Sequence, residues 1–355
     1  MTHETTPSGE AAAAGPIRVL VTGASGFVGG ALLERLRHDP AIEVRGTGRR
    51  ALDDELYLSV DLSLPGAEEQ LAALAPFTPD VVVHAAARSA PWGTPAEFAA
   101  ENVGATRAVV RYAEGLARAP RLVFVSTASV LYEARDQLQL RDDAPLPPRF
   151  VNRYAATKAE AEEVVRGYRG EWVVLRPRAV FGPGDTTLYP RLAALAERGR
   201  LPRFREPRGR PVLSDLVSID TLVEYLVRAL TADGVPGRTL AVTNAQPVPL
   251  QATLARILTG AGLPAPTRTV SRRVALAAAT AVETAWRVVR RRGEPPITRY
   301  SIIVSAFSKT FDVSPCLALL GEPAVTLDEG IERFVASLND GRGGRNGREG
   351  RGGRG

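Results

Sequence analysis

The stretch that decides the fold is Val19–Gly30, whose sequence is VLVTGASGFVGG. The apolar, β-branched residues from Ile17 to Val21 are typical of a buried strand. Residues Ala31–Arg37, which follow the stretch, favour a helix. Between them, Gly23 permits a tight turn, Gly26 lets the backbone approach a phosphate, and Gly29 lets the helix pack on the strand. The sequence therefore predicts a turn that binds the pyrophosphate of a dinucleotide on the free N–H groups and positive end of the helix, rather than an ordinary glycine-rich connection. The expected contact residues are Gly23, Ser25, Gly26, Phe27, Val28 and Gly29.

Length and composition are those of a globular protein. With 355 residues, of which 45% are hydrophobic, the chain can bury a large core in one large or two small domains. Its single cysteine, Cys316, excludes an internal disulfide, and the N-terminal residues lack the basic start and apolar core of a secretion signal. We therefore expect a cytoplasmic protein with a disordered leader at residues 1–15.

The positive charge is concentrated at the C-terminal end. Residues 341–355, GRGGRNGREGRGGRG, carry five arginines and one glutamate, whereas the net charge of the whole chain is +6. A glycine and arginine sequence cannot build a core, so this tail is expected to be disordered. Nucleic-acid binding is expected nowhere else in the chain, and even in the tail a solvated appendage is the simpler reading.

The end of the second expected strand bears on the choice of cofactor. Residues Ile42–Gly46 predict that strand, and Arg49 and Arg50 follow it where an NAD-selective site usually has an acid for the ribose 2′-hydroxyl. Either arginine suits a 2′-phosphate through charge-assisted hydrogen bonds, so NADP(H) is favoured. NAD(H) is the alternative, with Asp53 or Asp54 folding back to the ribose.

Two further strands are expected to bring small residues to the cofactor. Residues 56–60 predict a third strand, and Asp61 and Leu62 at its end can meet the adenine. A fourth strand, Asp80–His84, runs into small residues that let the cofactor lie against the sheet, and His84 itself is expected to be a packing or cofactor-side residue. The small residues are Ala85, Ala86 and Ala87.

A fifth expected strand, Arg121–Val125, delivers Ser126 and Thr127 to the same edge after a helix over Ala99–Ala117. Strands that alternate with helices in this way predict an α/β fold with a parallel, doubly wound sheet. In such sheets ligands bind outside the carboxyl ends of the strands, where these polar residues converge.

A tyrosine and a lysine follow at helical spacing. Tyr154 and Lys158 lie four residues apart at the start of a helix that continues to about Arg166, so they share one helix face. A nearby cation stabilises a phenolate, so Tyr154 can donate and accept a proton near neutral pH despite an ordinary pKa of about 10. Thr127, or Ser126 beside it, can hydrogen-bond the substrate oxygen. Taken alone, the pair can equally be a surface pair on a helix.

Three motifs in this order resemble the extended short-chain dehydrogenase/reductase superfamily: TGASGFVG at residues 22–29, STAS at residues 126–129 and YAATK at residues 154–158. The resemblance covers nearly the whole chain and includes LRPRAVFGPG at residues 175–184 and FDVS at residues 311–314. It implies a Rossmann-type fold and hydride transfer between a nicotinamide cofactor and a substrate.

The resemblance also implies roles for individual residues. Thr127, Tyr154 and Lys158 form the catalytic set, and Asn102 orders the active site through its helix. Lys158 anchors the nicotinamide ribose and lowers the pKa of the phenol. The segment after Arg176 holds the nicotinamide amide through backbone groups. Its expected contact residues are Pro177, Ala179 and Val180.

The branch of the superfamily is indicated by two other segments. Residues 85–93, AAARSAPWG, and residues 291–299, RRGEPPITR, resemble the 3β-hydroxysteroid dehydrogenase-like branch, including bacterial 2-alkyl-3-ketoalkanoate reductases. Sugar-nucleotide dehydratases carry an Asp-Glu pair after the catalytic threonine, but Ala128 and Ser129 stand here, so the acid and base of water elimination are missing. A sugar-nucleotide epimerase uses the same catalytic set and stays an alternative. A nucleotide-sensing scaffold is a further alternative, although a scaffold has no need of all three catalytic side chains.

Residues 16–180 are expected to form the cofactor-binding domain, and residues 181–340 a smaller, mostly helical substrate-binding region with some strands returning to the main sheet. Within the second region, Val274–Val289 is apolar between arginine clusters but carries Glu283 and Arg287. It is shorter than the roughly 20 apolar residues that span a bilayer. A core helix, a lid over a greasy substrate and a helix on a membrane surface are the three readings.

The expected partners are a small apolar substrate and, as the superfamily implies, a second copy of the chain bound through helices that flank the sheet. The three histidines and Cys316 are scattered, so no metal site is expected. An acidic group of the substrate can meet Arg178, Tyr189 or Arg191, although solvated arginines and a packed tyrosine are an equal alternative. The candidate substrate contacts are Ser89, Trp92, Thr127, Arg178, Tyr189 and Arg191.

Overall fold

The computed structural model describes residues 15–289, 291 and 293–349, and their side chains except those of residues 208 and 341–349. The predicted leader therefore lies outside the described residues apart from Gly15. The backbone is helical as far as Glu349, so the helix enters the range predicted as a disordered tail, and the rest of that tail is not described.

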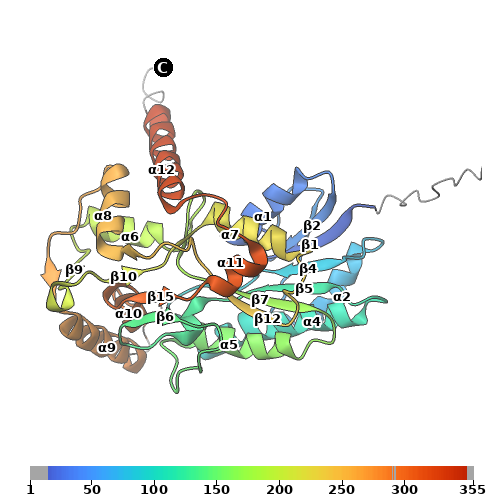
Figure 1. Cartoon of the computed structure of the whole chain (residues 1–355), viewed down its shortest axis with the longest axis horizontal. Helices are drawn as coiled ribbons and strands as arrows, with labels where there is room; N and C mark the ends of the chain where they lie inside the picture. The colour runs from blue at the N-terminus through green and yellow to red at the C-terminus, as the bar shows by residue number, and fades with distance from the viewer. Residues whose placement is uncertain (1–14, 290, 292, 350–355) are drawn as a thin grey trace, which may run out of the picture.

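A seven-stranded parallel sheet forms the centre of the molecule (Figure 1). Its order is β12-β7-β5-β4-β1-β2-β3, so the chain winds outward in both directions from the neighbours β1 and β4. Ligands of such sheets bind at this switch point. The strands are β1 (Ile17–Thr22), β2 (Ile42–Gly48), β3 (Tyr57–Ser59), β4 (Val81–His84), β5 (Arg121–Val125), β7 (Trp172–Pro177) and β12 (Arg238–Val242).

Helices cover both faces of this sheet, which confirms the predicted doubly wound α/β fold (Figure 1). One hydrophobic core lies between the sheet and the first helix layer, and a second core lies between the sheet and the helices on its other face. The central strands are apolar on both faces because each face packs against a helix layer. The first layer holds α1 (Phe27–Arg37), α7 (Ile219–Ala229) and α11 (Ser314–Leu320). The second holds α2 (Ala67–Leu71), α4 (Ala105–Gly115) and α5 (Arg153–Arg166).

The single α-helix predicted over Ala99–Ala117 is interrupted in the structure. A short helix, α3 (Pro95–Phe98), begins at a capping box on Thr94 and continues through a π-helical turn, Ala99–Gly104, into α4. Such π turns occur frequently at functional sites, and this one carries Asn102.

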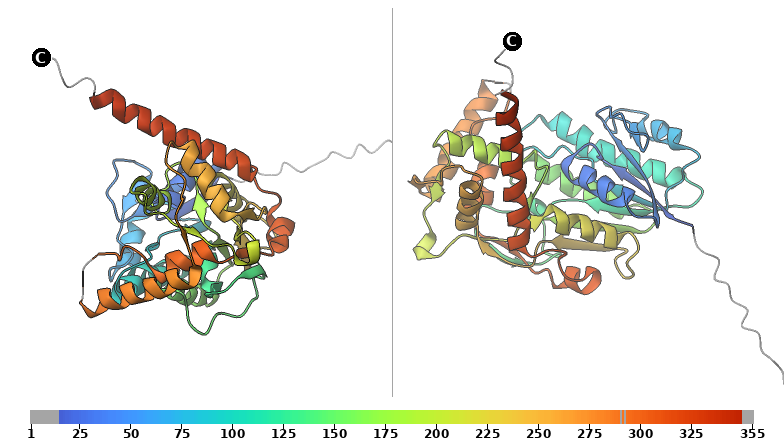
Figure 2. Two further views of the ribbon diagram at one scale, coloured as in Figure 1. Left: turned by 90° about the vertical axis from the view of Figure 1, so that its left-hand side faces the viewer. Right: turned by 90° about the horizontal axis from the view of Figure 1, so that it is seen from above.

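The C-terminal half builds a second, smaller region beside the carboxyl ends of the strands (Figure 1). Four strands form a small sheet of order β13-β10-β15-β6, and five helices belong to the same region. Figure 2 shows α12 projecting from the body of the molecule. The strands are β6 (Gln137–Leu140), β10 (Leu213–Ser214), β13 (Val248–Pro249) and β15 (Lys309–Phe311), with the pairs β8 (Val180–Phe181) and β11 (Val217–Ser218), and β9 (Arg203–Phe204) and β14 (Thr269–Val270). The helices are α6 (Tyr189–Glu197), α8 (Leu250–Gly260), α9 (Arg272–Val288), α10 (Arg299–Ala306) and α12 (Leu327–Glu349).

A buried carboxylate joins three segments of the main domain. Glu162 on α5 is fully buried and accepts hydrogen bonds from Arg176 Nε at 2.9 Å and Nη2 at 2.6 Å. It also accepts one from the hydroxyl of Ser126 at 2.6 Å. The arginine is at the end of β7 and the serine directly follows β5, so one charge network fixes the helix against two strand ends.

We predict that Glu162→Gln destabilises the protein by about 3–5 kcal/mol, because it leaves the buried Arg176 without its counter-charge. Glu160→Gln on the same helix is the control. Glu160 pairs with Arg107 on the surface, and exposed pairs contribute less than about 1 kcal/mol. Urea unfolding of both variants measures the difference, and equal losses would contradict the role given to Glu162.

Candidate active site

A cavity of about 810 Å³ opens at the carboxyl ends of the central strands and extends into the C-terminal region. One end is formed by the glycine turn after β1, and the other by apolar side chains of α6, α8 and the segment before α10. Thr127 and Tyr154 lie in the wall of this cavity.

The glycine turn has the backbone geometry that a pyrophosphate needs. Gly23 adopts a φ of +70°, and a Cβ there would lie 2.6 Å from the amide nitrogen of Ala86. A Cβ on Gly29 would lie 2.3 Å from the carbonyl oxygen of Gly23, so helix and turn touch backbone to backbone. The N-cap of α1 is Gly26, which offers no side-chain acceptor, and the first turn holds no acidic residue. The N–H groups at the start of α1 therefore suit an anionic group, and these residues fit a nicotinamide dinucleotide.

The structure brings together the two hydroxyl groups that the sequence singles out. The side chains of Thr127 and Ser89 lie near the hydroxyl of Tyr154 on α5 and act to lower its pKa. Thr127 follows Ser126 after the end of β5 and caps the 3-10 turn Ala128–Leu131. Its Oγ1 lies 3.0 Å from Oγ of Ser129. Burial, with the hydroxyl of Tyr300 adding to it, raises the pKa of Tyr154 to about 12. The phenol is therefore protonated at neutral pH.

Lys158 lies differently from the expectation. It is buried, its Nζ donates to the carbonyl of Val125 at 2.7 Å, and it sits 3.8 Å from the ring centroid of Phe124. Burial lowers the pKa of Lys158 to about 7. The expected lowering of the phenol pKa by Lys158 is wrong for this structure, because desolvation of Tyr154 is the largest influence and acts the other way.

Asn102 connects the loop after β4 to the helix that carries Tyr154. Its Oδ1 accepts from the backbone N–H of Arg88 at 2.7 Å, and its Nδ2 donates to Oγ1 of Thr157 on α5 at 2.9 Å. These contacts are consistent with the ordering role that the resemblance implies.

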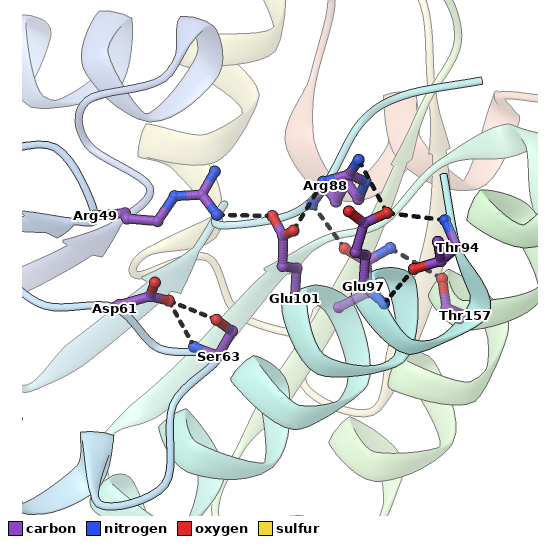
Figure 3. A network of polar contacts seen from close by, with 9 residues as sticks. Arg49, Asp61, Ser63, Arg88, Thr94, Glu97, Glu101 and Thr157 are labelled. Carbon is purple, nitrogen blue, oxygen red and sulfur yellow. Dashed lines mark hydrogen bonds and ion pairs between the residues drawn. The ribbon is translucent and has the colours of Figure 1, made fainter. Parts of the chain in front are cut away.

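The two arginines predicted to meet a 2′-phosphate directly follow β2 and lie outside the cavity wall. Arg49 pairs with Glu101 at 3.0 Å, and Glu101 also pairs with Arg88 at 2.8 Å, as Figure 3 shows. The side chain of Arg49 is 61% exposed. Asp61 accepts instead from the backbone N–H and hydroxyl of Ser63 (Figure 3).

Most of the predicted cofactor contacts line the cavity, and a minority lie behind or beside its wall. Those in the wall are Gly23, Gly26, Phe27, Val28, Gly29, Ala85, Ala87, Tyr154, Pro177, Ala179 and Val180. Those outside it are Ser25, Arg49, Arg50, Asp61, Leu62, Ala86 and Lys158. Leu62 belongs to a hydrophobic core. Ala179 has a φ of +46°, which an L-residue adopts only where its surroundings impose it, and such positions concentrate at functional sites.

Five of the six candidate substrate contacts line the cavity, and the exception is Trp92, whose ring lies under Arg287 at 5.2 Å. Arg191 pairs with Glu294 at 3.2 Å near the rim. The contacts in the wall are Ser89, Thr127, Arg178, Tyr189 and Arg191.

A second tyrosine of the site escapes the sequence analysis. Tyr300 on α10 lines the cavity together with Ser129, and burial raises the pKa of Tyr300. Thr298 starts this helix with a capping box, which predicts a helix start but not which side chain faces the site.

The far end of the cavity is mostly apolar. Leucines of α6 and α8, together with Ile297 and Phe334, line it. The helix α9 contributes no residue to the wall, which does not support the lid reading of this helix, whereas several residues of the segment 296–305 line the cavity. Among the described residues, no helix has the length and apolar character needed to cross a membrane, and no group of three metal-ligating side chains is found.

The glycine turn after β1, the hydroxyl groups of Tyr154 and Thr127 and the parallel sheet are together those of a nicotinamide-dependent oxidoreductase of the short-chain type. The model of the NAD dependent epimerase/dehydratase family matches residues 19–242, and the chain belongs to this family. With it, the chain belongs to the extended short-chain dehydrogenase/reductases.

Relatives cover nearly the whole chain. The 2-alkyl-3-oxoalkanoate reductase of Stenotrophomonas maltophilia is 31% identical over 90% of this chain and 99% of its own length. A farnesyl dihydroquinoline-oxide ketoreductase of Stigmatella aurantiaca is 31% identical over 89% of this chain and 95% of its own. Among solved structures, the Bordetella bronchiseptica enzyme WbmH in complex with NAD+ has a TM-score of 0.68 at 20% identity, covering 92% of this chain and 99% of that one. This structural likeness shows the fold.

Proposed function

We propose that the protein interconverts a ketone and a secondary alcohol on an apolar substrate, a β-keto or β-hydroxy acyl compound or a hydroxysteroid-like one, with NADP(H) as the favoured cofactor. The observation that carries the proposal is that Tyr154 and Thr127 line one cavity together with the glycine turn and the apolar side chains of the C-terminal region. The names of the relatives, which are reductases of oxo compounds, support the same reading.

The protein's own residues then act on the substrate oxygen. Thr127 holds the carbonyl oxygen by a hydrogen bond, and Tyr154 gives it the phenolic proton as the carbon is reduced. The nicotinamide, when bound, supplies the hydride. A phenol whose pKa lies near 12 is protonated at neutral pH, which suits the reductive direction. Lys158, Pro177 and Ala179 are proposed to hold the nicotinamide ribose and amide.

An epimerase that uses the same catalytic set is the second candidate, because solved structures of similar fold include a UDP-glucuronic acid 4-epimerase from Bacillus cereus (TM-score 0.65, 20% identity, 91% of this chain and 99% of that one). Its hallmark would be NAD retained through purification and no net change in cofactor absorbance. The apolar far end of the cavity favours a greasy substrate over a sugar nucleotide. A nucleotide-sensing scaffold would bind NADPH and oxidise no alcohol.

The outer face of α9 is proposed to contact a membrane surface, from which an apolar substrate can be drawn. Ala275 and Ala279 pack into the core, whereas Val274 is 62% and Val288 76% exposed at the two ends of the helix. Arg273 and Arg287 are exposed beside these valines. Basic residues around an apolar stripe suit anionic lipid headgroups. We also propose that the protein forms a homodimer through helices that flank the sheet, and that it is located in the cytoplasm.

We predict that Tyr154→Phe lowers kcat by at least about a thousandfold, because the variant has no proton to give to the substrate oxygen. Its Kd for NADPH is expected to stay within about twofold of the original, since no hydrogen bond to the pyrophosphate is lost. Depletion of NADPH or NADH absorbance with β-keto acids, ketosteroids and UDP-sugars measures turnover, and fluorescence titration measures cofactor binding. A fully active variant would remove the mechanism.

We predict that Arg49→Ala weakens NADPH binding by about 10- to 100-fold and leaves NADH binding within about twofold, because only the 2′-phosphate needs the charge. Arg45→Ala is the control, since Arg45 lies on β2, the strand that Arg49 follows, and donates to the carbonyl of Glu55. Fluorescence titration with both cofactors gives the ratio, and an equal loss for both would argue for NAD(H).

We predict that the protein cosediments with vesicles that contain phosphatidylglycerol and that Val288→Glu reduces the bound fraction several-fold, because it puts a carboxylate among the headgroups. Leu138→Glu is the matched control, because Leu138 is an exposed apolar residue on β6. Equal behaviour of the two variants would exclude α9 as the contact.

A further inference from the structure

Glu101 is a carboxylate shared between two arginines. Its Oε2 accepts a hydrogen bond from Nη1 of Arg49 at 3.0 Å, and its Oε1 accepts one from Nη1 of Arg88 at 2.8 Å (Figure 3). The side chain of Glu101 is 17% exposed and that of Arg88 26%, whereas that of Arg49 is 61% exposed. Glu101 and Arg88 are therefore held within the fold, and Arg49 reaches them from the solvent.

A second set of contacts fixes the carboxylate of Glu101. The residue belongs to the π-helical turn between α3 and α4. Its partner Arg88 also pairs with Glu97 at 3.3 Å and lies over the ring of Phe98 at 5.5 Å. Glu101 thus presents a fixed negative charge to Arg49, and Arg49 is the member of the pair that is free to turn toward another acceptor.

Arg49 starts beside the glycine turn that fits a pyrophosphate. It directly follows Gly48, the last residue of β2, and a Cβ on Gly48 would lie 2.9 Å from Oγ of Ser25 in that turn. The backbone N–H of Ala24 in the turn donates to the carbonyl of Thr47 at 3.0 Å. In dinucleotide-binding sheets the residue at this strand end meets the adenosine ribose, so Arg49 is placed to meet a 2′-phosphate on that ribose.

The charges around Arg49 cancel without a cofactor. Two arginines, Arg49 and Arg88, face two glutamates, Glu97 and Glu101. A phosphate monoester carries a charge of about −1.5 to −2 at neutral pH, so a 2′-phosphate meets a neutral cluster rather than a basic one. It bonds Arg49 either in exchange for Glu101 or next to the negative charge of Glu101. Both cases cost binding free energy that NADH does not lose, because NADH has no phosphate there.

We propose that Glu101 is a specificity-determining residue of the cofactor site, whose carboxylate competes with the 2′-phosphate for Arg49 and so reduces the preference for NADPH over NADH. This inference rests on the proposed role of Arg49 as a ligand of the 2′-phosphate. Its consequence is that two arginines after β2 do not make the protein exclusive for NADPH, and both cofactors are expected to bind.

Fluorescence titration of the full-length protein with NADPH and with NADH tests this inference, and the ratio of the two dissociation constants is the readout. We expect Glu101→Gln to shift the ratio about 5- to 10-fold toward NADPH, because Arg49 loses its competing partner. The Kd for NADH is expected to stay within about twofold. Glu97→Gln is the matched control, because Glu97 pairs with Arg88 in the same cluster, and its expected shift is less than about twofold.

Combining Arg49→Ala with Glu101→Gln separates competition for Arg49 from direct repulsion of the phosphate. In the Arg49→Ala background, Glu101→Gln is expected to shift the ratio by less than about twofold, because competition needs the guanidinium. Glu101→Asp keeps the charge but draws the carboxylate back by one carbon. It decides the matter if thermal unfolding shows Glu101→Gln to be misfolded, and we expect it to shift the ratio toward NADPH by about threefold or more.

An unchanged ratio in Glu101→Gln, or in Glu101→Asp where the first variant misfolds, would overturn the inference. Equal shifts with and without Arg49, or equal shifts in Glu97→Gln and Glu101→Gln, would overturn it as well. Failure of the proposed cofactor contact gives a different result, because Arg49→Ala then leaves the ratio unchanged, which assigns the 2′-phosphate to another group such as Arg50 and removes the role of Glu101. Failure of the reductase function is separate again, since no ketone then oxidises either cofactor while the binding ratios still shift.

Discussion

The mutual position of the active-site groups depends on one buried carboxylate. Glu162 accepts hydrogen bonds from Ser126, Arg176 and Arg166. Ser126 and Arg176 each lie within two residues of a side chain in the cavity wall. Thr127 follows the serine, Arg178 stands two positions after the arginine, and Tyr154 lies on the helix of Glu162 itself. Tyr154 and Thr127, for which we propose the roles of proton donor and oxygen ligand, are therefore positioned by a single network.

Burial then sets the chemistry of the groups that this network positions. It raises the pKa of Tyr154 and lowers that of Lys158, so in both cases the neutral form is favoured. The spacing of Tyr154 and Lys158 predicts that the cation lowers the pKa of the phenol. The ammonium instead lies against Val125 and the ring of Phe124, behind the cavity wall, where its nearest partners belong to β5.

Local patterns were enough for the sheet, the glycine turn and the pairing of Thr127 with Tyr154, because each depends on residues close in sequence or on the shared edge of parallel strands. Contacts between distant segments were not predictable in this way. Tyr300 reaches the site only because α10 folds over it, and Arg49 meets Glu101 because the edge of the sheet lies beside the π turn. The π turn itself has no local signature, since the residues around Asn102 read as ordinary helix.

The outermost strand on one side of the main sheet comes from the C-terminal half. β12 pairs with β7 over five residue pairs, and the backbone N–H of Ala241 donates to Asp142 at 2.6 Å. A fragment that stopped after β7 would leave a long apolar strand with unpaired backbone groups, which invites aggregation. The main sheet therefore contains a strand from each half of the chain, and the two halves are not separate structural units. Recombination between relatives could exchange the helices that surround the substrate, but only if residues 238–242 stayed with the sheet they complete.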